Sequence, residues 1–478
     1  MLPLPKTKIV CTIGPSSWIP EVMKQLIENG MTVARVNGAF ASVDEMKKIA
    51  SVVRSLSNEI ALMIDIKGHE VRLNKFEKDF DVKAGDTVVF GNDDSEYIYV
   101  STFPDLYKSL RPGINLLVDD GNTSLIVEKI ENKKIYAKVI YGNKIPKGKS
   151  LNVPGIFLDN PPITERDMEQ IRYAVEDKWD FVAASFVRCK ADVDAVKYLL
   201  KGTHTKVISK IEDSFGVQNI DEIIEASEGI MVARGDLAVE IPFAKVPHVQ
   251  KEIIKKCNKA VKPVIVATQM LESMIKNPRP TRAEISDIAN AIYDGADAVM
   301  LSGESTTGDY PVECVKVMKS VALETERYLY HSQDHFLKKT VQDCSVLDEG
   351  TEIAMAVAQS VANLSFKMPD AKIIVDTRTG FSAKLISSYN IQNTVIAMTP
   401  YDYYARRLAM VKGIKGISRS NYTDIKNMYE LEKLLIEDAK NKKLIQHGDR
   451  IILMISSSYN FESDSQINEK SSIKIVTI

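Results

Sequence analysis

The chain has 478 residues, which is too long for one ordinary hydrophobic core, so we expect two or three domains. Its 62 lysines and arginines nearly balance its 64 aspartates and glutamates, so no overall field attracts nucleic acid or an anionic membrane. No apolar run is long enough to span a bilayer, and residues 1–6 (MLPLPK) lack the apolar core of a secretion signal, which predicts a cytoplasmic protein. The five cysteines contain no C-x-x-C pair, which favours reduced thiols over disulfides or a zinc site.

Short β-branched apolar runs recur along the first 330 residues, and most are followed by a stretch with helical periodicity. The eight predicted strands are residues 8–12, 32–36, 60–65, 181–186, 206–211, 229–233, 263–267 and 298–301. A strand followed by a helix, repeated eight times, predicts an α/β fold, the parallel (β/α)8 TIM barrel. In such a barrel the C-terminal ends of the strands build the active site.

One interval breaks this rhythm, because the third strand ends near Asp65 and the next helix begins only near Thr164, whose hydroxyl is placed to cap it. The interval contains alternating runs and turn signals that predict a small β-barrel or sandwich. These runs are residues 87–90, 97–101, 116–119, 124–130 and 134–141. An inserted domain at the catalytic face can act as a lid that excludes water.

The pattern changes again after Tyr330. A polar, linker-like stretch at 331–348 is followed by a predicted helix at 351–365, a strand at 372–376 and further α/β units. We therefore predict three domains. Their bounds are 1–67 with 160–335 for the barrel, 68–159 for the inserted β-rich lid, and 340–478 for a C-terminal α/β domain with effector or assembly roles.

Two neighbouring predicted strands end in charged residues typical of phosphate chemistry. Lys210 and Glu212 lie two apart, so their side chains share a face, and Asp236 follows the next strand. Two carboxylates beside a lysine can hold a divalent metal against an anionic substrate. The competing interpretations are an ordinary ion pair and, for residues 234–236 (RGD), a cell-adhesion motif, but the strand-end position favours a site.

Polar residues follow several of the other predicted strands. They are Arg35, Asn37, Asp65, Lys67, Thr268, Ser302 and Glu304. Because the carboxyl ends of the barrel strands meet at one rim, we expect these side chains to surround Lys210.

Three shorter motifs are less specific. Residues 142–150 (GNKIPKGKS) resemble a Walker A loop, but five residues separate the glycines instead of four and no helix follows. His331 and His335 share a helix face, and we interpret them as a solvated pair rather than a metal site. Residues 377–382 follow a strand and fit equally a phosphate-binding nest and a plain strand-to-helix turn.

The ordered motifs along most of the chain resemble pyruvate kinase. The matching segments are 7–17 (TKIVCTIGPSS), 33–35 (VAR), 67–68 (KG), 209–212 (SKIE), 232–237 (VARGDL), 267–274 (ATQMLESM), 280–284 (PTRAE) and 300–304 (MLSGE). The resemblance implies a barrel with an inserted β-domain and a C-terminal α/β domain, usually as a homotetramer. It also implies transfer of the phosphoryl group of phosphoenolpyruvate to ADP, giving pyruvate and ATP, the last step of glycolysis.

The same resemblance implies a role for each candidate residue. Lys210 would neutralise the transferring phosphoryl group, and Glu212 with Asp236 would hold Mg2+ or Mn2+. Gly235 and Asp236 would receive the substrate carboxylate through backbone N–H groups, and Thr268 would help deliver a proton to the enolate. The remaining assignments are Arg35 and Arg72 as phosphate clamps, Lys149 and Pro15 near ADP or ATP, Ser302 at the substrate, and Thr377, Thr379, Gly380 and Ser382 at an effector phosphate.

The chain departs from the family pattern where a monovalent cation, K+, would bind. Asn37, Asp65 and Ile66 match ligand positions, but Ala39 replaces a serine and Ile66 a threonine. Glu70, by contrast, is the residue type of potassium-dependent members. The sequence therefore predicts a weakened or altered potassium site.

Three functions agree with these residues. The first is a working pyruvate kinase. The second is a metal-dependent lyase or aldolase acting on pyruvate enolates, which the lid with Lys149 and the two arginines argue against. The third is a catalytically inactive regulatory paralogue, which is motivated by Ala39, Phe40, Ile66 and His69.

Overall fold

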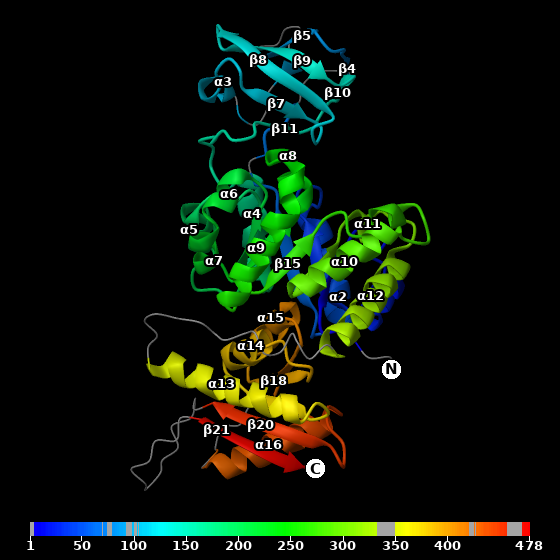
Figure 1. The fold of residues 1–478 in the computed structure, drawn as a ribbon, viewed down its shortest axis with the longest axis vertical. Helices are drawn as coiled ribbons and strands as arrows, with labels where there is room; N and C mark the ends of the chain where they lie inside the picture. The colour runs from blue at the N-terminus through cyan, green and yellow to red at the C-terminus, as the bar shows by residue number, and fades with distance from the viewer. Residues whose placement is uncertain are drawn as a thin grey trace.

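The structure is a computed structural model that describes residues 4–68, 70–73, 79–91, 98–99, 103, 105–331, 349–419, 425, 427–456 and 471–478. Three bodies follow one another along its long axis, and the barrel lies between a β-rich body and an α/β body that carries the C-terminus (Figure 1). None of the helices in the described parts of the chain is long and apolar enough to cross a membrane. The described residues do not include His69 or residues 332–348, which make up all but the first residue of the predicted linker at 331–348. The predicted pair of His331 and His335 is therefore also not described, since the side chain of His331 is left out with it.

Eight parallel strands close into a barrel, which confirms the predicted fold. Around the barrel the order is β1-β16-β15-β14-β13-β12-β3-β2. The strands are β1 (Lys8–Thr12), β2 (Met31–Asn37), β3 (Ala61–Ile66), β12 (Phe181–Ala184), β13 (Lys206–Ile211), β14 (Gly229–Ala233), β15 (Val264–Ala267) and β16 (Ala298–Leu301). Alternate side chains such as Val10 and Met63 fill the barrel interior, while Ile9 and Leu62 pack outward against the helices.

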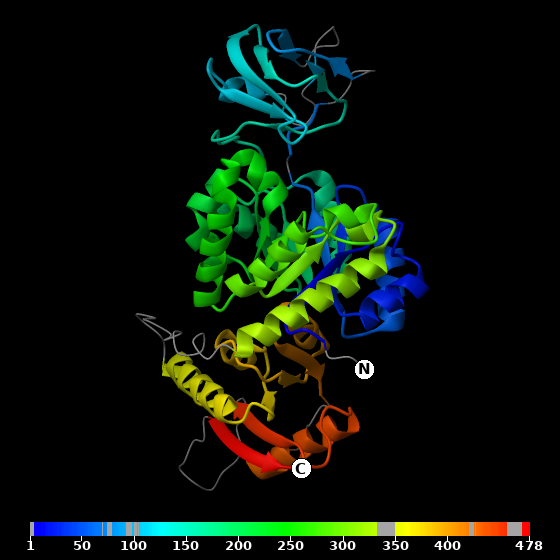
Figure 2. The same cartoon turned by 45° about the vertical axis from the view of Figure 1, so that its right-hand side comes forward.

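Helices surround the barrel in the predicted order. They are α1 (Pro20–Glu28), α2 (Val43–Leu56), α4 (Glu165–Glu176), α5 (Lys190–Leu199), α6 (Ser214–Gln218), α7 (Ile220–Ala226), α8 (Arg234–Glu240), α9 (Val246–Lys259), α10 (Arg282–Asp294), α11 (Gly303–Thr306) and α12 (Pro311–His331). The long helix α12 runs from the barrel toward the C-terminal body (Figure 2). Cys11, Cys189, Cys257 and Cys314 are free thiols.

Helix α4 begins where the chain returns from the insert, and Thr164 caps it as the sequence predicts. The Thr164 hydroxyl accepts a hydrogen bond from the backbone N–H of Asp167, and the Asp167 carboxylate accepts one from the Thr164 N–H. Because this reciprocal cap satisfies two backbone donors, we expect Thr164→Ala to lower the free energy of unfolding by about 1 kcal/mol. Thr164→Ser keeps the hydroxyl and should unfold like wild type in urea; equal loss in both variants would contradict the cap.

The insert between β3 and α4 is β-rich and has its own apolar core. Strand β10 (Lys144–Ile145) pairs with β4 (Phe80–Asp81), and the other strands form a six-stranded sheet in the order β11-β7-β8-β9-β5-β6. Its strands are β5 (Thr87–Gly91), β6 (Ile98–Tyr99), β7 (Asn115–Val118), β8 (Thr123–Glu131), β9 (Lys134–Tyr141) and β11 (Leu151–Asn152), with the short helix α3 (Leu106–Ser109). The sequence patterns indicated β5 to β9 and missed the two-residue strands β4, β10 and β11.

The C-terminal body is a five-stranded sheet in the order β19-β18-β17-β20-β21, antiparallel only at β21. Helix α13 (Glu349–Lys367) and α14 (Phe381–Ser388) pack on one face of the sheet and α16 (Met428–Asn441) on the other. The strands are β17 (Lys372–Asp376), β18 (Val395–Thr399), β19 (Ile414–Ser418), β20 (Arg450–Ser456) and β21 (Ser471–Thr477), with α15 (Asp402–Arg407) between β18 and β19. Met410 of this body reaches into the barrel core.

Candidate active site

Lys210, near the end of β13, lies at the centre of a buried polar cluster at the C-terminal rim of the barrel. Its Nζ is 2.9 Å from Glu212 Oε1 and 3.1 Å from Asp65 Oδ1, and it donates a hydrogen bond to Ser185 Oγ at 2.7 Å. Burial alone would lower the pKa of Lys210, but the carboxylates of Asp65 and Glu212 hold it above its ordinary value. Lys210 is therefore a fixed positive charge.

Arg35, on β2, lies beside this lysine and shares its carboxylate partner. Its Nε and one terminal nitrogen donate to Asp65 Oδ2 at 2.8 and 2.7 Å, and its other terminal nitrogen donates to Thr12 Oγ1 at 2.7 Å. Burial raises the pKa of Asp65, but Arg35 and Lys210 outweigh it and hold that pKa below its ordinary value. Asp65 therefore joins the two cations and fixes their positions.

Two further carboxylates, Glu212 and Asp236, face the same lysine. Burial raises the pKa of Glu212 to about 7, and repulsion from Asp236 and Asp65 adds to it against the pull of Lys210. Burial also raises the pKa of Asp236, with added repulsion from Glu70 and Asp120. The two cations, Lys210 and Arg35, thus face three carboxylates. A further cation would be bound favourably, because it would reduce the repulsion among these carboxylates.

The oxygens of Glu212 and Asp236 suit a hard divalent ion, which is normally held by one or two protein carboxylates with substrate and water. Glu212 Oε2 is oriented by the backbone N–H of Phe186 at 2.6 Å. Within the described ranges, no group of three or more His, Cys, Asp or Glu side chains is arranged to hold a metal by itself. The donor set therefore fits Mg2+ or Mn2+ shared with a ligand.

Thr268 and Gly235 meet beside Asp236. The Gly235 N–H donates to Thr268 Oγ1 at 2.8 Å, and the Thr268 hydroxyl donates to the carbonyl of Ala267 at 2.6 Å. Thr268 has a backbone φ of +68°, which is rare for a β-branched residue and marks local strain of the kind found at functional sites. A Cβ placed on Gly235 would approach Thr268 no closer than 3.6 Å, which is an ordinary contact distance. The protein therefore leaves space for another atom beside Gly235.

Arg234, the first residue of α8, holds the segment at Thr268 in place. It donates to the carbonyl of Thr268 at 2.7 Å and pairs with Asp287 of α10 at 2.7 Å. It therefore ties the strained segment at Thr268 to the helix layer, a role that the sequence argument did not assign.

The residues expected near a nucleotide lie on two bodies. Pro15 is exposed in the loop after β1. Arg72 lies where the chain enters the lid, and there it pairs with Glu70 at 2.7 Å and donates to the carbonyl of Gly148 at 2.7 Å. Lys149 is half exposed and pairs with Asp119 of the lid at 2.8 Å. Arg35 lies in the cluster itself, where Asp65 and Thr12 hold its guanidinium, and its role as a phosphate clamp stays a prediction.

The expected monovalent-cation residues supply few free oxygens. Asn37 Oδ1 accepts the N–H of Ala39 at 3.1 Å, and both oxygens of Asp65 contact Arg35, Lys210 or Ser185. Ile66 is buried and offers no side-chain oxygen. The weakened potassium site stays a prediction.

The other expected residues lie at the rim and in the C-terminal body. The Ser302 N–H donates to Glu304 Oε2 at 2.7 Å, so the buried Glu304 orients the loop after β16. In the C-terminal body, Thr377 Oγ1 accepts the N–H of Gly380 at 3.1 Å, and Gly380, with φ of +87°, begins helix α14. Thr379 is exposed beside it and Ser382 is buried.

Sequence reasoning missed Ser185 and Thr12, which bridge the cluster through Lys210 and Arg35. Thr12 ends a predicted strand, so the rule that selected the other rim residues could have found it. Ser185 was hidden inside the predicted strand at 181–186, because the observed strand β12 ends at Ala184.

The comparisons with known proteins agree with this geometry. Residues 4–315 match the family "Pyruvate kinase, barrel domain", and residues 355–465 match "Pyruvate kinase, alpha/beta domain". This chain belongs to the pyruvate kinase family. It is similar to the pyruvate kinases of Bacillus licheniformis (40% identical), Geobacillus stearothermophilus (41%) and Staphylococcus aureus strain MRSA252 (39%), and each alignment covers 94% of this chain and 77% of the relative. The pyruvate kinase family consists of phosphotransferase enzymes, so this chain is one.

Proposed function

We infer that this chain is a working pyruvate kinase that transfers the phosphoryl group of phosphoenolpyruvate to ADP, giving pyruvate and ATP in glycolysis. The observation that carries this inference is the buried cluster in which Lys210 and Arg35 face Asp65, Glu212 and Asp236 at the barrel rim. Phosphoryl transfer needs fixed cations around a group whose negative charge spreads over three oxygens. Lys210 supplies one such charge in a site shielded from water.

The remaining positive charge would come from a divalent metal, and we propose Glu212 and Asp236 as the residues that hold Mg2+ or Mn2+. When bound, the metal neutralises phosphate and enolate oxygens. Lys210 orients and neutralises the transferring group. We propose that Thr268 helps to deliver a proton to the enolate. Its hydroxyl accepts the Gly235 N–H and donates to the Ala267 carbonyl, so it would have to turn away from that carbonyl to donate toward the substrate. Because the Gly235 N–H is already used, the Asp236 N–H is the better candidate for the substrate carboxylate.

The lid, Pro15, Arg72 and Lys149 are proposed to enclose ADP, with Ser302 at the substrate side. We keep residues 1–67 with 160–335 as the catalytic barrel, 68–159 as the lid and 340–478 as the C-terminal domain. The loop with Thr377, Thr379, Gly380 and Ser382 is proposed to bind an effector phosphate at the start of α14. A cytoplasmic homotetramer is what the resemblance to the family supports.

A coupled assay for pyruvate tests this function. Purified protein with phosphoenolpyruvate, ADP and Mg2+ should form pyruvate, and omission of any one of the three should abolish it. Folded wild-type protein that forms no pyruvate would contradict the inference, and tight nucleotide binding without turnover would favour the inactive paralogue.

The monovalent cation gives a separate prediction. Because Ala39 and Ile66 supply no side-chain oxygen, we expect wild type to turn over at similar rates in Na+, in K+ and in buffer free of both. The double variant Ala39→Ser with Ile66→Thr adds two hydroxyls and should gain activation by K+. Strong K+ activation of wild type would contradict the weakened site.

A further inference from the structure

The return connection from the lid to the barrel, residues 149–160, is here called the lid stem, and its two ends are held very differently. Segment 156–160 is fastened to the barrel by the buried Arg188, which donates to the carbonyls of Leu158 at 2.6 Å and Asn160 at 3.2 Å. Phe157 of this segment also meets the Phe215 ring edge-to-face at 5.4 Å. This side of the stem is therefore a fixed anchor.

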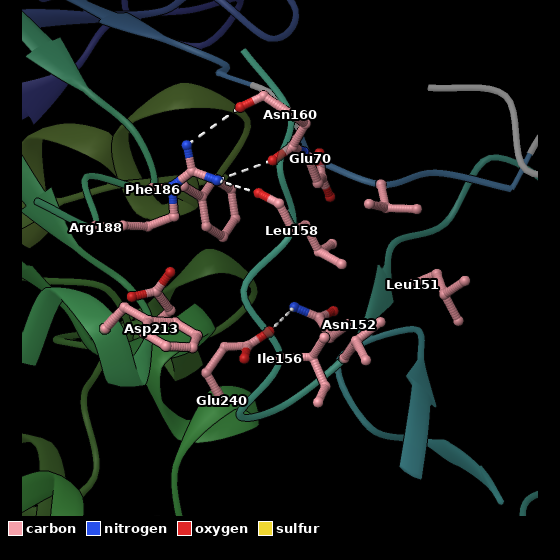
Figure 3. A pocket seen from close by; sticks show the side chains of 13 residues that line it. Glu70, Leu151, Asn152, Ile156, Leu158, Asn160, Phe186, Arg188, Asp213 and Glu240 are labelled. Atoms are coloured by element: carbon pink, nitrogen blue, oxygen red, sulfur yellow. Dashed lines mark hydrogen bonds between the residues drawn. The ribbon is translucent and has the colours of Figure 1, made fainter. Parts of the chain in front are cut away.

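The other segment, β11, contacts helix α8 through a side-chain hydrogen bond. Asn152 Nδ2 donates to Glu240 Oε1 at 2.8 Å, across a cavity of about 70 Å³ that has room for a few waters (Figure 3). Gly155 lies between the anchor and this contact, and its φ is +76°. A Cβ placed on Gly155 would have no other atom within 4 Å, so the protein does not pack against this glycine. The stem thus has a fixed end, a conformationally free glycine at Gly155 and a polar contact to helix α8.

Glu240 is the last residue of α8, one helical turn after Asp236, which we propose as a metal ligand. The lid also reaches the site electrostatically, since Asp120 raises the pKa of Asp236. A change in lid position therefore changes the environment of Asp236, which lies on the same helix as Glu240.

We propose that Glu240 is a positioning residue whose hydrogen bond to Asn152 latches the lid stem to helix α8 and so sets the position of the lid relative to the catalytic rim. The latch rests on the proposed function only for its kinetic effect, because the contact itself is structural. Charged groups that face Glu240 around the cavity are Asp213, Glu70 and Arg188.

The protonation of Glu240 supplies a second signature. Burial raises the pKa of Glu240 from its ordinary 4.5 to about 7, with Asp213 adding to the shift and Asn152 opposing it. If contact with the lid stem raises the pKa of Glu240, protonated Glu240 stabilises that contact. This stabilisation is complete below about pH 4.5 and is lost as the pH rises through about 7. The latch should weaken from pH 5 to about 7 and then stay level.

Hydrogen exchange of the lid-stem amides, together with steady-state kinetics, tests the latch in the full chain. Loss of a hydrogen bond to a carboxylate predicts that Glu240→Ala lowers the protection factors of residues 149–153 and raises KM for ADP by about tenfold, with kcat little changed. Glu240→Gln keeps the acceptor oxygen and should restore both values while abolishing their pH dependence. Asp159→Asn, on the exposed part of the anchored segment, is the matched control and should behave like wild type.

Asn152→Ala removes the latch from its other side and serves if Glu240→Ala does not fold. The double variant should then be no worse than either single one, because both remove the same bond. Wild-type stem protection in both alanine variants, or a Glu240→Gln variant as impaired as Glu240→Ala, would overturn the latch. Exchange needs no turnover, so its result stands apart from the assay for pyruvate.

Discussion

Lys210→Met should lower kcat by about a thousandfold, because it removes the fixed positive charge on which the transferring phosphoryl group depends. Methionine keeps much of the length and apolar stem of lysine, so the change removes charge more than volume. The measurement is steady-state pyruvate formation at saturating phosphoenolpyruvate and ADP.

The same substitution also leaves Asp65 and Glu212 without their shared cation. Breaking a buried ion pair typically costs about 3–5 kcal/mol, so thermal unfolding must show that the variant is folded at the assay temperature. Lys206→Met is the matched control, since Lys206 lies on the same strand, β13, at the opposite end of the barrel. A Lys210→Met enzyme that is folded and retains most of its kcat would contradict the assigned role.

Glu212→Gln should weaken Mn2+ binding by on the order of a hundredfold and lower activity at fixed Mg2+ to a similar degree, because it removes one of the two charged ligands that we propose. Raising the Mg2+ concentration should restore part of the rate. Titration of Mn2+ followed by electron paramagnetic resonance measures the binding without substrate.

The neighbouring Asp213 provides the control for Glu212. Its carboxylate caps α6 by accepting the N–H of Gly216 at 2.7 Å, and asparagine caps a helix equally well. Asp213→Asn should therefore leave the Mn2+ affinity unchanged. Wild-type Mn2+ affinity in Glu212→Gln would exclude Glu212 as a ligand.

The barrel was predictable because its information is local. Each strand is a short apolar run, as at β13 with Lys206 to Ile211, and most are followed by a helix with its own periodicity. The strand-end rule then brought Lys210, Glu212, Asp65 and Arg35 to one rim, where the structure places them in contact. Short lid strands such as β4 and β11 gave no signal, because two residues carry no detectable alternation.

Pairings between distant segments could not be read from the sequence. Nothing local shows that Arg35 is occupied by Asp65 and Thr12, or that the Gly235 N–H is taken by Thr268. The insertion of Met410 into the barrel core and the contact of Asn152 with Glu240 likewise depend on how whole bodies dock. Such contacts are set by tertiary packing, on which sequence periodicity carries no information.

Phosphorus NMR of a mixture of phosphoenolpyruvate, ADP, Mg2+ and the purified protein tests the central claim most directly. We expect the phosphoenolpyruvate resonance to decline while the β- and γ-phosphate resonances of ATP grow in equal amount, and Lys210→Met to leave the spectrum unchanged on the same timescale. A decline accompanied by inorganic phosphate instead of ATP, or no change with folded wild-type protein, would contradict it.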